Sequence, residues 1–368
     1  MSDTRHLYVH LPFCAHRCGY CDFVTSVGRH EQHDAYVDAL LTELELERQS
    51  PAQELETIFL GGGTPTFTKP EALERLLAGL PRAAEVTVEA NPETVTPAVA
   101  NLLRRGGVDR VSLGAQSFRP HLLATLERRA DGETVRRAFH TLRDASFDNI
   151  SLDLIYGIPG QSASDLDRDL AAALALEPEH LSCYELEAKP GTRFTHAHGD
   201  ELARQADAME SYFERVVETL TAAGLRWYET ANFCRVDARD LRSRHNLAYW
   251  LGRDYLGLGV GAVSTIAGRR WRNTPRLAGY MEALARAMVP EREVEPLSSD
   301  VLRRERVMLG LRLDEPLVLG DLAGVVDDRA VSRLELLGLV RRDADRQTLA
   351  LTPRGRFLGG GVTVDLLT

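Results

Sequence analysis

The sequence predicts an α/β protein with a parallel sheet, followed by a smaller unit of helices and a hairpin. Apolar runs of strand length alternate with segments of helical period over the first half of the 368 residues. Six such βα units in succession imply parallel strands, because each strand is regained through a crossover. A flat doubly wound sheet and a curved, incomplete barrel both fit this pattern.

The predicted strands and helices follow one another in a regular order. The strands are expected at 7–13, 57–60, 85–90, 110–115, 150–156 and 181–186. The helices are expected at 33–48, 70–80, 97–105, 132–145 and 164–176. In the first helix Tyr36, Leu40 and Leu44 recur every four residues, which places them on one face.

The sequence pattern of the C-terminal part differs from the βα alternation before it. The acidic stretch 291–295, between two prolines, predicts a linker. Beyond it, 300–311 and 331–337 have helical period, and the apolar alternation at 339–342 and 347–352 predicts a two-stranded wing. Helix, helix and hairpin in this order predict a winged-helix-like α+β domain that serves as a lid or docking surface, since the chain is acidic.

Composition limits the function classes. Hydrophobic residues make up 44% and charged residues 27%, as in ordinary globular proteins. No apolar run reaches the roughly 18 residues that cross a bilayer, and no export signal is evident, so we expect a cytoplasmic protein without an integral membrane segment. A net charge of −10 argues against a nucleic-acid partner.

Three of the five cysteines fall within eight residues. Cys14, Cys18 and Cys21 have the spacing C-x3-C-x2-C, and three thiolates fill three corners of a [4Fe-4S] cube, leaving one iron open. A zinc-stabilised scaffold is the alternative, with His10 or His16 as the fourth ligand. The odd number of cysteines and the lack of a secretory signal disfavour disulfides.

Unusual residues stand where the predicted strands end. In parallel α/β proteins ligands bind at the carboxyl ends of the strands. The second strand runs into Gly61-Gly62-Gly63-Thr64, without the Lys-Ser/Thr ending of a phosphate loop. Glu89, Gln116 and Asp153 mark the ends or inner positions of the next three strands. Each of them, taken singly, is also compatible with a tight turn or a buried, satisfied hydrogen-bonding group.

Together these motifs resemble the radical SAM superfamily, and within it the branch of the oxygen-independent coproporphyrinogen dehydrogenases (HemN) and the HemW haem chaperones. The resemblance rests on LYVHLPFC at 7–14, FLGGGTPT at 59–66, VEANP at 88–92, SLGAQSF at 112–118 and DLIYG at 153–157. It implies a partial (β/α)6 radical SAM barrel at 1–235, a barrel-closing extension at 236–290 and a C-terminal HemN-type domain at 291–368.

The resemblance also implies cofactors and their residues. The three cysteines would hold a [4Fe-4S] cluster whose open iron is chelated by S-adenosylmethionine. The residues implied for S-adenosylmethionine are Tyr8, Tyr20, Gly62, Gly63, Thr64, Glu89, Gln116, Arg128 and Asp153. Gln116, Arg128 and Asp153 match positions that hold a second S-adenosylmethionine in the dehydrogenase, and the sequence leaves open whether one binds here.

Three departures from the dehydrogenase pattern favour the chaperone branch. Cys21 is followed by Asp22-Phe23 where the dehydrogenase continues as C-x-C, and only six residues precede Leu7. Residues 245–250 read HNLAYW and match the H-N-x-x-Y-W motif of HemW proteins. The haem residues that this motif implies are His245, Asn246, Tyr249 and Trp250. A histidine on a reachable loop beside flat aromatic groups suits reversible haem binding. Alternatively, the aromatic residues anchor the loop and the histidine bonds to backbone.

These observations predict a cytoplasmic radical SAM haem chaperone that delivers haem, as cargo, to apo-haemoproteins. The alternative is an oxygen-independent coproporphyrinogen III dehydrogenase. No catalytic residue is assigned, and the sequence does not decide whether S-adenosylmethionine is cleaved. The expected partners further include an electron donor such as flavodoxin or ferredoxin and a second copy of the chain in a homodimer.

Overall fold

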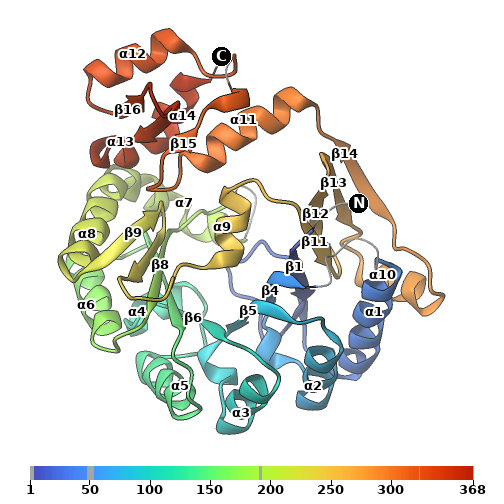
Figure 1. The fold of residues 1–368 in the computed structure, drawn as a ribbon. Helices are drawn as coiled ribbons and strands as arrows, with labels where there is room; N and C mark the ends of the chain where they lie inside the picture. The colour runs from blue at the N-terminus through green and yellow to red at the C-terminus, as the bar shows by residue number, and fades with distance from the viewer. Residues whose placement is uncertain (1–3, 48–53, 190–192, 323, 368) are drawn as a thin grey trace.

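A computed structural model describes residues 4–47, 54–189, 193–322 and 324–367. Figure 1 shows a curved sheet whose outer side is covered by helices, which is an open barrel and not a flat doubly wound sheet. The predicted strands correspond to β1 (His6–Leu11), β4 (Leu55–Gly62), β5 (Ala83–Ala90), β6 (Arg110–Gln116), β7 (Ile150–Tyr156) and β8 (His180–Glu185). These strands are neighbours in this order and pair in parallel, so the predicted α/β fold is confirmed.

The outer helices begin where the sequence supplies a cap. They are α1 (His33–Leu46), α2 (Pro70–Gly79), α3 (Pro97–Arg105), α5 (Gly132–Asp144), α6 (Ala163–Leu174) and α8 (Met209–Ala222). The side chains of Thr96 and Asp131 accept backbone N–H groups at the starts of α3 and α5, and Ser162 forms a capping box with Asp165 at α6. The predicted βα alternation is therefore fixed locally as well as by packing.

Further strands extend the sheet to 12 strands at both of its edges. Beyond β1 lie β11 (Tyr255–Leu258), β12 (Val263–Ile266), β13 (Arg269–Asn273) and β14 (Arg292–Pro296), and beyond β8 lie β10 (Asn232–Arg235) and β9 (Leu225–Glu229). The prediction of a linker at 291–295 is wrong, because β14 pairs with β13 there. An edge strand carries exposed charged residues, so its sequence resembles that of a linker.

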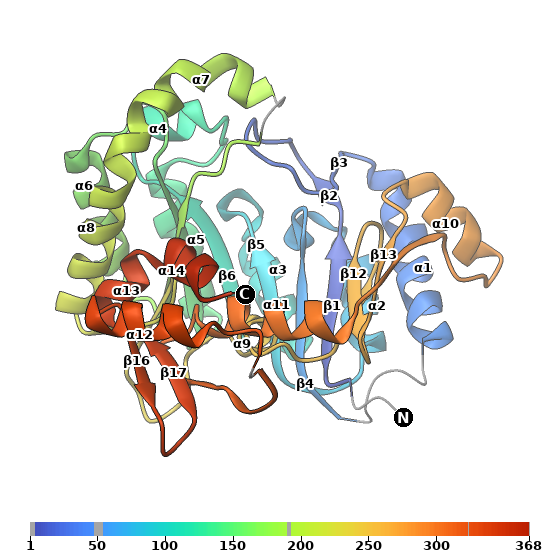
Figure 2. The same ribbon diagram turned by 90° about the horizontal axis from the view of Figure 1, so that it is seen from above.

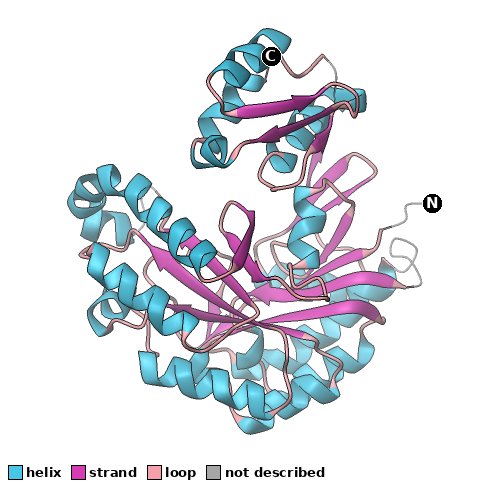
Figure 3. Ribbon diagram, turned by 60° about the vertical axis from the view of Figure 1, so that its left-hand side comes forward, coloured by secondary structure: helices cyan, strands magenta, loops and turns pink. Residues whose placement is uncertain are grey.

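The C-terminal unit has its own core, which includes Val307, Val331 and Leu349. It consists of α11 (Ser299–Gly310), β15 (Leu317–Val318), α12 (Asp328–Leu336), β16 (Val340–Asp343), β17 (Thr348–Leu351), α13 (Pro353–Phe357) and α14 (Gly359–Leu366). Figure 3 shows it as a separate lobe beside the open side of the barrel. The predicted helices and hairpin are present, and β15 adds a third strand to the wing.

Two further features position the site. The short helix α9 (Arg244–Trp250) lies on the inner side of the curved sheet (Figure 1). At the end of the barrel to which the parallel strands point, Figure 2 shows the segment β2 (Phe13–Cys14) to β3 (Ser26–Val27) near α4 (Pro120–Thr125) and α7 (Arg193–Gln205).

Away from the site, α10 (Leu277–Ala285) packs beside α1. None of the helices described combines the length and apolar character needed to span a membrane.

Candidate functional site

A cavity of about 680 Å³ lies inside the barrel and opens toward the carboxyl ends of the parallel strands. This volume is in the range of sites for small molecules and cofactors. Fifteen of the sixteen site residues that the sequence suggests line it: Tyr8, Cys14, Cys18, Tyr20, Cys21, Gly62, Gly63, Thr64, Glu89, Gln116, Arg128, Asp153, His245, Asn246 and Tyr249. Trp250 is not among the lining residues.

The three cysteines lie on the segment that links β2 to β3. Cys14 is buried at the end of β2, whereas Cys18 and Cys21 are half-buried and joined by a turn in which Cys21 N–H donates to Cys18 O. Burial raises the pKa of the Cys14 thiol to about 11 and also raises the pKa of Cys21. Without a metal these two thiols are therefore protonated at neutral pH, and metal binding must displace their protons.

Two side chains donate hydrogen bonds to the cysteine sulfurs. The Thr64 hydroxyl lies 3.5 Å from Cys14 Sγ, and Arg128 Nη1 lies 3.7 Å from Cys18 Sγ. Asn91, which follows β5, contacts both donors. Donors to thiolate sulfur fit a negatively charged cluster, whose properties depend on such bonds. Asn91 is absent from the predicted site residues, although its position at the end of a strand was a usable signal.

The histidines suggested as a fourth zinc ligand already have other partners. His10 contacts the Tyr8 hydroxyl over 3.0 Å and the Val24 carbonyl over 2.8 Å, so both of its ring nitrogens are used. Nε2 of His16 donates to the Glu127 carbonyl over 3.0 Å. These hydrogen bonds disfavour His10 and His16 as the fourth ligand of a zinc site.

The glycine run at the end of β4 allows close packing against the β1 segment. Gly62 has a φ of +109°, and a Cβ there would lie 2.5 Å from the ring of His10. A Cβ on Gly63 would lie 2.7 Å from the Pro12 backbone. Gly62 N–H donates to Glu89 over 3.1 Å, so the run also joins β4 to β5. Only glycine fits these positions without moving His10 or the Pro12 backbone.

Two buried carboxyl groups face the cavity. Burial, with the nearby Asp153, raises the pKa of Glu89 to about 7. Burial also raises the pKa of Asp153, which accepts a hydrogen bond of 2.9 Å from Ser112 and one of 3.3 Å from Ser151. Arg110, 2% exposed, lowers both pKa values, and its Nε has no hydrogen-bond partner among the described residues. Arg110 and Ser112 alternate along β6, and these polar residues in a buried strand were a signal that it lines a site.

Gln116 stands at an irregularity in the sheet. Its φ is +64°, which is rare outside glycine, and the pairing of β6 with β7 shifts register between Gly114 and Gln116. Bulges of this kind turn a side chain away from its regular direction and are frequent beside functional sites. Here the turn brings the last residue of β6 to the wall of the cavity.

His245 lies on a helix and is 1% exposed, so the prediction that it lies on a reachable loop is wrong. Its Nδ1 lies 2.7 Å from the Thr57 hydroxyl and its Nε2 lies 2.9 Å from the Tyr249 hydroxyl, so its partners are side chains and not backbone. Burial lowers the pKa of His245 to about 3. The imidazole is therefore neutral at physiological pH, which is the form that binds metals.

Trp250 joins α9 to the C-terminal domain. Its ring belongs to an apolar cluster with Tyr228, Leu241 and Leu313. The guanidinium of Arg312 stacks 4.4 Å from the ring centre, and Arg306 donates to the Trp250 carbonyl over 3.2 Å. The structure thus brings His245, Asn246 and Tyr249 to the cavity and places Trp250 at the domain contact.

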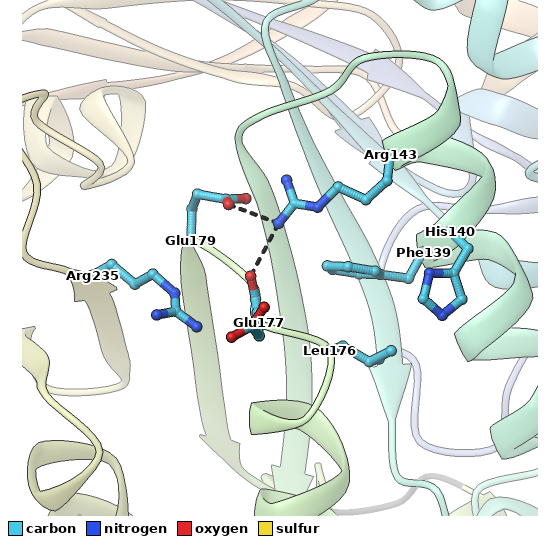
Figure 4. Close-up of a pocket in the computed structure, with 7 residues that line it drawn as sticks. All are labelled: Phe139, His140, Arg143, Leu176, Glu177, Glu179 and Arg235. Carbon is cyan, nitrogen blue, oxygen red and sulfur yellow. Dashed lines mark hydrogen bonds and ion pairs between the residues drawn. The ribbon is translucent and has the colours of Figure 1, made fainter.

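A second hollow, of about 450 Å³, lies on the outer side of the barrel near the start of β8 (Figure 4). Arg143 occupies it, donating to Glu179 over 2.7 Å and to the Glu177 carbonyl over 3.0 Å. Glu179 also accepts Ile150 N–H over 2.9 Å. These contacts hold α5, β7 and β8 together, which is a structural role.

Comparisons with known proteins agree with this architecture. A family model described as the radical SAM superfamily matches residues 8–173. A Mycobacterium tuberculosis protein named heme chaperone HemW is 38% identical over 98% of this chain and 94% of its own length. Proteins of the same name from Bacillus subtilis (35% identical, 83% of this chain, 82% of the relative) and Escherichia coli (37%, 78% and 78%) are also similar.

Among solved structures, coproporphyrinogen III oxidase HemN from Escherichia coli has a similar fold. The two superpose with a TM-score of 0.80 at 24% sequence identity, covering 100% of this chain and 91% of the other. At that identity the likeness concerns the fold.

Proposed function

The chain belongs to the HemW family of the radical SAM superfamily, and from this premise we propose that it is a haem chaperone that binds haem and passes it to apo-haemoproteins. The observation that carries the proposal is the position of α9. His245, Asn246 and Tyr249 face the same cavity as the three cysteines, so cargo and cofactors would share one cavity.

Membership of the radical SAM superfamily implies a [4Fe-4S] cluster and S-adenosylmethionine. We assign the cluster to Cys14, Cys18 and Cys21, because they share a cavity and two of their sulfurs accept hydrogen bonds from Thr64 and Arg128. S-adenosylmethionine would be held by the cavity residues that the resemblance implies for it: Tyr8, Tyr20, Gly62, Gly63, Thr64, Glu89, Gln116, Arg128 and Asp153. When bound, the two cofactors supply one-electron chemistry.

The chain's own residues would prepare this site in two ways. Thr64 and Arg128 direct their protons at sulfurs that become thiolates, and such charge-assisted bonds are stronger than neutral ones. Glu89 and Asp153 lie in a buried cavity and are easier to ionise when a cation is near, which favours a ligand that carries an amino or sulfonium group.

For haem, we assign His245 as the iron ligand. Its imidazole is neutral, and if Nδ1–H donates to Thr57, the lone pair of Nε2 is held only by the Tyr249 hydroxyl. Exchanging that hydrogen bond for iron requires Tyr249 to move away from Nε2. Asn246 and Tyr249 would contact the macrocycle, and Trp250 would act indirectly by holding the end of α9 against Arg312.

The test is a haem titration of the full chain, carried out anaerobically after cluster reconstitution. We expect a Soret band in the wild type and at least a tenfold weaker affinity in His245→Gly. Because His245 is buried, its removal leaves a cavity, and added imidazole should restore the band. His140→Gly, on the outer face of α5, is the matched control. Unchanged binding by His245→Gly would remove His245 as the ligand, and no binding by the wild type would refute the chaperone.

The same preparation distinguishes the chaperone from the enzyme. Incubated with coproporphyrinogen III, S-adenosylmethionine and a reductant, the protein should form no protoporphyrinogen IX. Formation of that product at a catalytic rate would make the dehydrogenase the function in place of the chaperone.

We further propose a cytoplasmic protein that receives electrons from a flavodoxin or ferredoxin and acts as a homodimer. Phe23, 58% exposed at the cavity mouth, offers an apolar contact near Cys21 for such a donor. Reduction of the cluster by reduced flavodoxin, and the mass of the reconstituted protein in solution, test these two points separately.

A further inference from the structure

One asparagine of the cavity contacts both donors that reach the cysteine sulfurs. Asn91 Nδ2 donates to Thr64 Oγ1 over 2.9 Å, and its Oδ1 accepts from Arg128 Nη2 over 2.9 Å. Thr64 in turn donates to Cys14 Sγ, and Arg128 Nη1 donates to Cys18 Sγ. A single carboxamide therefore connects the hydrogen bonds to two of the three thiols.

Chemistry fixes the direction of every bond in this chain. An arginine side chain only donates, so the oxygen of the Asn91 carboxamide must face Arg128. Its NH2 group then faces Thr64 and occupies a lone pair of the hydroxyl. The hydroxyl proton of Thr64 is left to point at Cys14 Sγ. Removing the carboxamide therefore takes one hydrogen-bond partner from each donor at once.

The surroundings hold these groups in place. Arg128 Nη2 also donates to the Gly114 carbonyl over 2.9 Å. A Cβ on Gly114 would lie 2.8 Å from the Gln116 side chain, so the glycine leaves room for Gln116 beside this network. Thr64 is 2% exposed. Three separate loops, those after β4, β5 and α4, meet at Asn91.

We propose that Asn91 is a positioning residue that raises the reduction potential of the cluster by holding Thr64 and Arg128 against Cys14 and Cys18. The inference rests on the cluster assignment of the proposed function. Hydrogen bonds to the sulfurs stabilise the more negative, reduced cluster, and they are among the features that set the potential of iron–sulfur proteins. When the carboxamide is lost, the Thr64 hydroxyl and the Arg128 guanidinium each lose the partner that directs them at a sulfur, and Arg128 is then positioned by Gly114 O alone.

The experiment is a redox titration of the reconstituted full chain, followed by the electron paramagnetic resonance signal of the reduced cluster. Asn91→Leu should shift the midpoint potential to a more negative value with unchanged iron and sulfide content. Thr64→Val, which removes one of the two bonds, should shift it in the same direction by less. Asn101→Leu is the matched control, because Asn101 is exposed and donates only to Pro97 O within α3.

A double variant tests the path of the effect. If Asn91 acts through Thr64, Asn91→Leu should shift the potential less in the Thr64→Val background than in the wild type. A wild-type potential in Asn91→Leu, or shifts that add fully, would overturn the inference. Should Asn91→Leu fail to hold a cluster, an unchanged potential in Thr64→Val would overturn it equally. A wild type that binds no cluster would instead refute the proposed function.

Discussion

At the scale of single residues, Glu43 is a buried carboxyl group that joins α1 to the sheet edge. It accepts hydrogen bonds from Tyr280 (2.6 Å), Asn273 (2.7 Å) and Gly259 N–H (2.8 Å). Burial nevertheless dominates and raises its pKa from 4.5 to about 7. Between these two values the folded chain binds a proton that the unfolded chain has lost, so stability falls as pH rises through this window.

Comparison with a variant that does not titrate measures this effect. The free energy of unfolding of the wild type, minus that of Glu43→Gln, should fall by up to about 3 kcal/mol between pH 5 and pH 8. Urea unfolding at both pH values gives the difference, with Glu71→Gln on the exposed side of α2 as the control. A difference that does not change with pH would show that Glu43 is ionised throughout.

The site shows which residues a sequence can and cannot reveal. The cysteines were predictable because their spacing is local, and Gly62, Glu89 and Asp153 because the ends of parallel strands meet. Asn91 also follows a strand, but its hydrogen bonds to Thr64 and Arg128, which lie on other loops, could not be predicted. The burial of His245 was missed because a helix of seven residues is too short to show a periodic pattern.

At the scale of elements, α9 is held between the barrel and the C-terminal domain. Arg312 stacks on Trp250 and donates to Glu229 over 2.7 Å, and Glu229 is fully buried. Arg312→Met removes the charge and leaves this carboxylate without its cation. We expect a loss of about 2 kcal/mol in the free energy of unfolding, because a buried charge that loses its partner is costly.

A double-mutant cycle checks whether the pair causes the loss. Glu229→Gln combined with Arg312→Met should be less destabilised than the sum of the two single variants, as measured by urea unfolding. Arg341→Met, exposed on β16, is the control. Additive losses would place the effect in packing against Trp250 rather than in the ion pair.

Elements with a strong local pattern were predictable, and those defined by a partner were not. Between residues 55 and 174 the observed strands and helices begin and end within a few residues of their predicted bounds. Caps such as Ser162 and periodic apolar faces define these bounds locally. The strand β14 was missed because only its pairing with Trp271 and its neighbours on β13 makes it a strand.

At the scale of the whole molecule, the C-terminal domain lies beside the open side of the barrel and has a core of its own. Two aromatic contacts, several arginines and the apolar cluster around Trp250 fasten it to the barrel. Phe357 packs 5.5 Å from Phe213 and 5.3 Å from Trp227, and Arg356 stacks 3.6 Å from the Trp227 ring. Arg226 forms a two-point ion pair with Asp314 at 2.7 and 3.0 Å.

If haem enters the cavity from this side, loosening the domain should speed both its uptake and its release. Phe357→Ser removes the aromatic contact while leaving the separate core of the domain intact, so we expect a larger radius of gyration and faster proteolysis at 296–299. Haem association and dissociation rates, followed by stopped-flow absorbance, should rise together, whereas the affinity changes little, because His245, the proposed ligand on α9, is untouched. Leu358→Ser, at the neighbouring position that is already exposed, is the matched control. An opened domain with unchanged haem rates would place the entry at the cysteine end of the barrel instead.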